Sequence, residues 1–153
     1  AGNEGPGCGS VDSPLALYDE VFTVGAIDEA EEVTPFSSRG PVTADGSNRV
    51  KPDVVAPGVG ILSAYPGSTY YRNEGTSMAG PHVAGVVALL WSANPALIGD
   101  IDATERILID TAQPASGVPR DSLPCDDLST RPNDAAGYGI VDAYAAVRRA
   151  LEP

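Results

Sequence analysis

A serine at the start of a predicted apolar helix is the strongest candidate for chemistry in this chain. It is Ser77, in the run Gly75-Thr76-Ser77-Met78-Ala79-Gly80-Pro81-His82, which continues directly into Val83-Ala84-Gly85-Val86-Val87-Ala88-Leu89-Leu90-Trp91. Gly75 allows unusual dihedral angles and a close backbone approach, and the small residues leave room for a substrate carbonyl. The helix start supplies unpaired N–H groups and the positive end of the helix dipole, which stabilise an oxyanion. The alternative is that Ser77 or Thr76 only caps the helix.

The eight residues 75–82 resemble the nucleophile motif of the subtilisin-like serine proteases. Other matches to this family follow in the order that it requires, and they are Ala1-Gly2-Asn3-Glu4-Gly5, Val24-Gly25-Ala26, Phe36-Ser37-Ser38-Arg39-Gly40-Pro41, Lys51-Pro52-Asp53-Val54-Val55-Ala56-Pro57-Gly58 and Gly137-Tyr138-Gly139-Ile140-Val141-Asp142-Ala143. The resemblance covers nearly the whole chain. It implies a serine endopeptidase that hydrolyses peptide bonds through an acyl-enzyme on Ser77, with Asn3 as a side-chain donor of the oxyanion hole. Outside this context, Asn3 would be interpreted as a turn residue.

The resemblance also implies an α/β fold, namely a subtilisin-like layered fold with a largely parallel sheet. Residues 1–153 are expected to form the C-terminal half of one peptidase domain, with only the later strands and the C-terminal helices and with no second domain. Such a half-domain would leave a sheet edge and apolar helix faces uncovered.

The apolar pattern predicts the individual elements. Strands are predicted at Val21–Ile27, Asp53–Ala56, Ile61–Ala64 and Ser68–Arg72, and helices at Thr76–Ala93, Asp102–Thr111 and Asp142–Leu151. Asp102 and Glu105 fit a capping box, with Asp in place of Ser or Thr. Residues 113–136, rich in Pro, Ser and Asp, are expected to form an ordered surface loop.

The groups that would activate Ser77 are not recognised in this chain. The family order is aspartate, histidine, serine, and the chain begins at the oxyanion asparagine, so the first two are expected upstream. His82 is the only histidine. It lies roughly 7.5 Å along the helix axis from Ser77 and on a different face, whereas hydrogen-bond reach is about 3 Å, so it is interpreted as structural. The isolated chain is therefore expected to be inactive, with the missing N-terminal half as its partner.

Substrate contacts follow from the same resemblance. Gly2 and Thr76 are expected beside a polypeptide substrate, and the segment Glu4–Leu15 is expected to wall the pocket for the side chain before the scissile bond. Glu4 would lie near the rim and, on one alignment, Asp12 near the floor, where a carboxylate favours Lys or Arg. We favour the alternative that Asp12 caps a turn before Ser13-Pro14 and faces solvent. Met78 abuts the nucleophile, so its oxidation is expected to impair a complete enzyme.

No cofactor is required for this chemistry, but calcium is the family's usual structural ion. Asp53 matches a position that contributes an oxygen ligand near the loop Ala16–Val21. Hard cations need several oxygen ligands, so a local polar contact of Asp53 is favoured over a metal site. Lys51 replaces an acidic residue sometimes found there, and its ammonium is an alternative to the cation. Glu74 replaces a small or amide residue and adds negative charge near the active site.

The cysteines and the net charge limit the compartments and the binding partners to consider. Cys8 and Cys125 are the only cysteines and lack zinc-like spacing. If the protein is secreted, as the family usually is, a Cys8–Cys125 disulfide is favoured; the alternatives are two buried thiols or bridges to cysteines elsewhere. The net charge of −12 argues against binding to nucleic acid or anionic membranes, and no apolar run is long enough to span a membrane. A second function class remains, namely a non-enzymatic half-domain that acts as a scaffold or interaction module.

Overall fold

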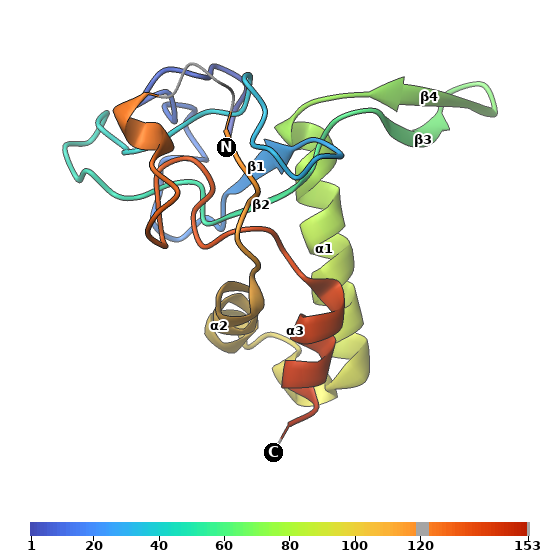
Figure 1. Cartoon of the computed structure of the whole chain (residues 1–153). Helices are drawn as coiled ribbons and strands as arrows, with labels where there is room; N and C mark the ends of the chain where they lie inside the picture. The colour runs from blue at the N-terminus through green and yellow to red at the C-terminus, as the bar shows by residue number, and fades with distance from the viewer. Residues whose placement is uncertain (119–122, 153) are drawn as a thin grey trace.

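The computed structural model describes residues 1–118 and 123–152 and is built around one long helix, α1 (Thr76–Ala93). Figure 1 shows α1 beside the short strands β1 (Val24–Ile27) and β2 (Val54–Pro57), with α2 (Ile101–Thr111) and α3 (Ala143–Ala150) near its C-terminal end. Two single turns, η1 (Pro95–Leu97) and η2 (Pro124–Asp126), complete the helical elements of the described residues. Within these residues, no helix has the length and apolar character needed to cross a membrane.

Strands β1 and β2 form a parallel pair that is covered on both faces. Their register runs from Val24 opposite Val54 to Ile27 opposite Pro57. Because successive side chains of a strand point to opposite faces, Val54 and Ala56 join the core against α1, whereas Val55 joins a second core with Ile27 and Val33. The short apolar runs predicted as buried strands therefore form the middle layer of an α/β arrangement.

Strands β3 (Ile61–Tyr65) and β4 (Thr69–Asn73) pair antiparallel and make a hairpin that projects from the body of the molecule (Figure 1). Its turn places Gly67 at φ 83° and Ser68 at φ 57°, in the left-handed region that glycine tolerates best. All of β4 is exposed, and so is β3 after its first residue. The rings of Tyr65 and Tyr71 lie 5.4 Å apart on it.

Helix α1 is apolar on most of its circumference but only partly covered. Ala79, Val83, Val86 and Leu90 are buried against β1, β2 and the other helices. Ala84, Ala88 and Leu89 are exposed, and 53 % of Leu89 is accessible. A helix with apolar residues on all sides is normally buried on all sides. The exposed face of α1 is therefore more apolar than is usual for a helix surface that faces solvent.

The observed boundaries lie within one residue of the predicted ones, except at the start of β1. The bounds of α1 are confirmed, but β1 begins three residues later than predicted, because Val21 and Thr23 use their polar groups in a loop rather than a ladder. The capping box at Asp102 is wrong, since Asp100 is the N-cap and accepts a hydrogen bond from Ala103 N at 3.0 Å. Helix α3 begins at Ala143, one residue later than predicted, because Asp142 is its N-cap and accepts a hydrogen bond from Ala145 N.

The segment 113–136 is not simply a surface loop. Residues 119–122 lie outside the described residues, but Cys125, Asp126, Ala135 and Ala136 are buried. The Pro-rich composition correctly indicated irregular backbone, whereas the burial depends on partners far away in the sequence.

Candidate active site

Gly75 directly precedes α1, and its backbone conformation sets the direction in which the helix begins. Gly75 has φ 142° and ψ 163°, and its N–H donates to Gly58 O at 2.8 Å, which ties the helix start to the turn after β2. Gly58 allows this contact, because a Cβ there would come within 2.6 Å of Ala26 Cβ. The N-cap residue Gly75 has no side chain that could cap α1. The alternative that Thr76 or Ser77 serves as the cap is therefore wrong.

Asn3 takes the place of a cap from a distant part of the chain. Both Thr76 N and Thr76 Oγ1 donate to Asn3 Oδ1, at 2.9 and 3.2 Å. A backbone N–H requires an acceptor, so these bonds define which end of the amide is oxygen. The Asn3 Nδ2 group remains as a donor beside the helix start, and the buried Thr76 hydroxyl is hydrogen-bonded to the same amide.

Ser77 occupies the second position of α1 with an exposed side chain. The N–H groups of Met78 and Ala79 turn back to Gly75 O, at 3.0 and 3.4 Å. Within the part of the chain that the structure describes, the Ser77 N–H and hydroxyl have no hydrogen-bond partner. Two donors, Ser77 N–H and Asn3 Nδ2, thus lie at the positive end of one helix next to an exposed hydroxyl, an arrangement suited to an oxyanion.

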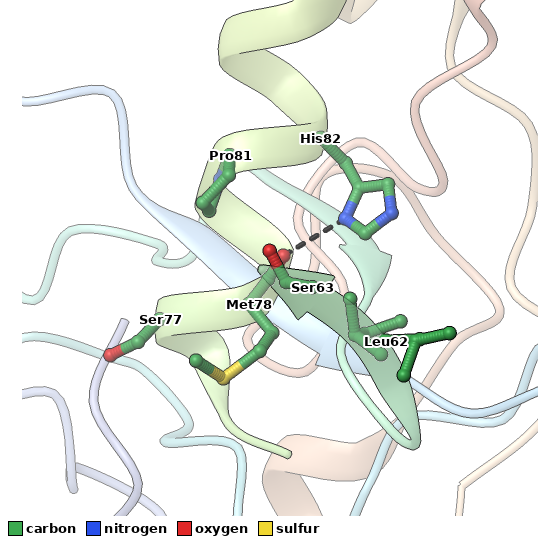
Figure 2. Close-up of a pocket in the computed structure, with 7 residues that line it drawn as sticks. Leu62, Ser63, Ser77, Met78, Pro81 and His82 are labelled. Carbon is green, nitrogen blue, oxygen red and sulfur yellow. Dashed lines mark hydrogen bonds between the residues drawn. The ribbon is translucent and has the colours of Figure 1, made fainter. Parts of the chain in front are cut away.

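His82 is turned away from this hydroxyl. Its Nδ1 lies 2.9 Å from Met78 O, one turn earlier in α1, and the residue is exposed. Figure 2 shows the Ser77 hydroxyl and the His82 ring pointing in different directions from the helix. The His82 ring is hydrogen-bonded to a backbone carbonyl, and no described contact links it to Ser77.

A cavity of about 280 Å³ lies beside the candidate nucleophile. It is open on one side and lies between the start of β3 and the first turns of α1 (Figure 2). Its lining consists of Ile61, Leu62, Ser63, Ser77, Met78, Pro81 and His82. The cavity offers space next to Ser77 for a group from outside the described chain.

The segment that carries Asn3 is hydrogen-bonded along residues 34–40. Gly5 N donates to Phe36 O at 2.9 Å and Ser38 N donates to Gly2 O at 3.1 Å. Gly2 has φ 105°, and a Cβ on it would meet Glu4 and Ser38 oxygens. The Glu4 carboxylate accepts from Ser38 Oγ at 3.0 Å. Asp12 is exposed and makes no hydrogen bond among the described residues, so neither a pocket floor nor a cap at Asp12 has a contact to support it.

Arg39 is a structural residue of this region that sequence reasoning missed. Its side chain is fully buried, with Nε 2.9 Å from Asp126 Oδ1 and its two terminal nitrogens donating to Ser37 O and Thr34 O. The neighbouring Cys125 forms a disulfide with Cys8. The sequence shows an arginine between Ser38 and Gly40, but its partner Asp126 lies 87 residues away, so no local pattern indicated the pair.

The surroundings of Asp53 do not fit a calcium ion. The ammonium of Lys51 lies 2.7 Å from Asp53 Oδ2 and 2.8 Å from Val21 O, and Asp53 also accepts from Thr23 N. These oxygens are the ligands that the cation would need, and a bound ammonium repels a divalent ion. Within the described residues, no group of three or more His, Cys, Asp or Glu side chains is arranged to hold a metal.

Comparison with known proteins places these features in a family. A family model described as "Subtilase family" matches residues 1–139. Bacillopeptidase F of Bacillus subtilis (strain 168) is 44% identical over 142 residues, which are 92% of this chain and 9% of that protein. Among solved structures, the prenylagaramide maturation protease PagA superposes with a TM-score of 0.70 at 29% identity, over 99% of this chain and 49% of that one. The Clostridium perfringens CspB protease superposes with a TM-score of 0.72 at 28% identity, over 95% and 29%.

These superpositions confirm the α/β fold that the sequence predicted. The chain spans less than half the length of each of these three proteins.

Proposed function

The chain belongs to the subtilase family, and on that premise we propose that it carries the nucleophile and the oxyanion hole of a serine endopeptidase that acts on polypeptides. The observation that carries the proposal is the pair of donors, Ser77 N–H and Asn3 Nδ2, beside the exposed Ser77 hydroxyl. Free N–H groups occur at every helix start, so the feature that points to catalysis is the exposed Ser77 hydroxyl beside the two donors.

In the proposed reaction, Ser77 Oγ attacks the carbonyl carbon of the scissile peptide bond and its proton passes to a base. The negative charge that develops on the carbonyl oxygen is stabilised by Ser77 N–H, Asn3 Nδ2 and the positive end of α1. The tetrahedral intermediate collapses, the C–N bond breaks, and the amine leaves with the proton. Water then attacks the acyl-enzyme by the same steps and releases the new carboxylate.

We propose that the base and its orienting carboxylate come from outside this chain, so that the chain alone is inactive. The only histidine is bonded to Met78 O, and an unactivated serine hydroxyl is a weak nucleophile at neutral pH. The cavity beside Ser77 supplies room for an incoming imidazole.

Three surfaces support the proposal that a partner binds this chain and completes the domain. The first is the exposed apolar face of α1 around Leu89. The second is an apolar cavity of about 330 Å³ whose lining includes Phe22, Val24, Val87 and Trp91. The third is the projecting β3–β4 hairpin, since a lone two-stranded hairpin is only marginally stable in water. A second half of the same domain, carrying the aspartate and the histidine, would cover apolar surface of this extent.

The test is labelling with a fluorophosphonate probe that reacts with activated serines. The chain alone should not be labelled, and the complete domain should be labelled at Ser77. Ser77→Ala should abolish labelling, while Ser63→Ala, a serine of the same cavity, should leave it unchanged. A folded, complete domain that is not labelled would contradict the proposal.

The same exposed surfaces also favour a second function, a non-enzymatic half-domain that binds another protein. The two functions differ in what they require of Ser77 and Asn3. If Ser77→Ala and Asn3→Ala left every activity of the complete protein unchanged, the interaction module would be the better description. The Cys8–Cys125 disulfide supports an oxidising and hence extracellular setting for either function.

A further inference from the structure

The chain contains a single lysine, Lys51, and that lysine is buried. Only 2 % of its surface is accessible, although lysine is among the residues least often buried without a partner. Its ammonium donates to Val21 O at 2.8 Å and to Asp53 Oδ2 at 2.7 Å. A charge placed this deep must be balanced by specific contacts, since transfer out of water disfavours it strongly.

The contacts of Lys51 belong to a larger arrangement around the loop of residues 16–23. Carbonyl oxygens of this loop are used as acceptors by side chains: Val21 O accepts from Lys51 Nζ and Thr23 Oγ1, and Ala16 O accepts from Thr23 Oγ1. A second cation, Arg49, donates to Leu17 O and to Asp45. The 16–23 loop is therefore held by positive side chains that bind its backbone oxygens.

Asp53, directly before β2, completes this arrangement of hydrogen bonds. Its Oδ2 accepts from both Lys51 Nζ and Thr23 N, and Asp53 N donates to Thr23 O at 2.8 Å. A backbone carbonyl and a carboxylate that converge on one positive centre form the oxygen environment that hard cations prefer. Here a side-chain ammonium occupies the centre.

We propose that the Lys51 ammonium is an internal cation that fastens the 16–23 loop to the start of β2 in place of a bound metal ion. The fold around this loop then needs no metal, and the ammonium excludes a divalent ion by repulsion at close range. The lysine differs from a bound ion in one respect. It is covalently attached, so neither dilution nor a chelator removes it.

This inference concerns the stability of the loop and stands apart from the proposed peptidase activity. The 16–23 loop connects residues 1–15, which include Asn3 and the expected wall of the substrate pocket, with β1. A loop fastened by a side chain holds this connection in solutions that contain no calcium.

The test is local hydrogen–deuterium exchange, followed by mass spectrometry on peptides that cover residues 16–23 of the complete protein. In the unmodified protein, protection of these amides should be the same with excess EDTA and with calcium. Lys51→Ala removes the ammonium and opens space, so protection should fall in EDTA and recover in part with added calcium. Lys51→Met keeps the chain length without the charge, and protection should fall in both solutions. Arg106→Met, which removes an exposed cation on α2, is the matched control and should change nothing in this peptide.

Two results would overturn the proposal. One is a loss of protection at residues 16–23 when the unmodified protein is transferred from calcium to EDTA, which would reveal a metal there. The other is unchanged protection in both Lys51 variants. If the variants fail to fold, acylation of the unmodified protein decides. Lys51 should resist an amine-reactive reagent in EDTA as well as in calcium, and rapid acylation in EDTA would contradict the inference.

Discussion

Asn3 and Thr76 lie 73 residues apart in the sequence and are joined by two hydrogen bonds, from Thr76 N and Thr76 Oγ1 to Asn3 Oδ1. This relationship orients the amide so that its nitrogen is the donor available next to Ser77. The segment around Asn3 and the start of α1 thus form one unit, and each of the two residues can be tested separately.

Removal of the Asn3 donor should lower turnover without unfolding the protein. Asn3→Ala is expected to reduce kcat of the complete enzyme by about 10²–10³, the magnitude known from subtilisin itself for loss of this kind of donor. KM should change little, and the melting temperature should fall only modestly, because the exposed Asn3 side chain also accepts two hydrogen bonds from Thr76 at the start of α1. Steady-state kinetics on a peptide substrate measure the effect. A loss that appeared in KM alone would show that Asn3 binds substrate rather than the oxyanion.

The Thr76 hydroxyl should contribute less than Asn3, because it acts through Asn3. Thr76→Val keeps the shape of the side chain and removes one of the two bonds to Asn3 Oδ1. A single hydrogen bond of this kind is worth about 0.5–1.5 kcal/mol, so kcat should fall about 2–10-fold. Thr76→Ser retains the hydroxyl and is the matched control. Equal kcat values for the two variants would show that the hydroxyl does not position Asn3.

Arg39 and Asp126 should stabilise the fold together. Arg39→Met leaves Asp126 buried without its partner, and the expected loss is about 3–5 kcal/mol in the free energy of unfolding. Urea denaturation measures it. The double variant Arg39→Met with Asp126→Leu should recover much of that loss, since both charges are then absent. Additive losses in the double-mutant cycle would mean that the two side chains are not coupled.

Asp134 should make stability depend on pH. Burial raises the pKa of its carboxyl group, and its Oδ1 is buried with no hydrogen-bond partner. A raised folded-state pKa means that the native state favours the protonated form. The contribution to stability is therefore present at pH values below the ordinary Asp pKa of 3.8, and it is lost as the pH rises through the higher folded-state pKa.

We accordingly expect Asp134→Asn to gain in melting temperature relative to the unmodified protein on going from pH 3 to pH 7. Thermal unfolding of both proteins across this range provides the measurement. Asp28→Asn, at an exposed turn, controls for the loss of one carboxylate. A difference that stayed constant with pH would show that Asp134 has an ordinary pKa.

The exposed face of α1 should be needed for association with the rest of the domain rather than for the stability of the isolated chain. Leu89→Asp is expected to leave the isolated chain no less stable and to weaken its association with the rest of the domain, because burial of a carboxylate without a partner is costly. Ile98→Asp, another exposed apolar position, is the control. The dissociation constant of the two halves measures the effect, and equal constants would place the partner elsewhere.

Local sequence determined most of the elements and the candidate nucleophile. The apolar run after Ser77 determined the bounds of α1, the β-branched runs located the short strands, and the glycine before Thr76 marked the helix start, since these features depend on neighbours within a few residues. The match of Asn3 and Ser77 to one family also came from the sequence.

Only the tertiary structure decided which distant groups share a site. It joined Thr76 to Asn3, Arg39 to Asp126 and Lys51 to Val21, and it shifted the start of β1 because the polar groups of Val21 and Thr23 bind to Lys51 and Asp53. Such contacts depend on the path of the whole chain. No local sequence pattern predicts which buried charged side chain will form a hydrogen bond with which carbonyl oxygen. The physical reason is that a buried polar group must find a partner wherever the fold supplies one.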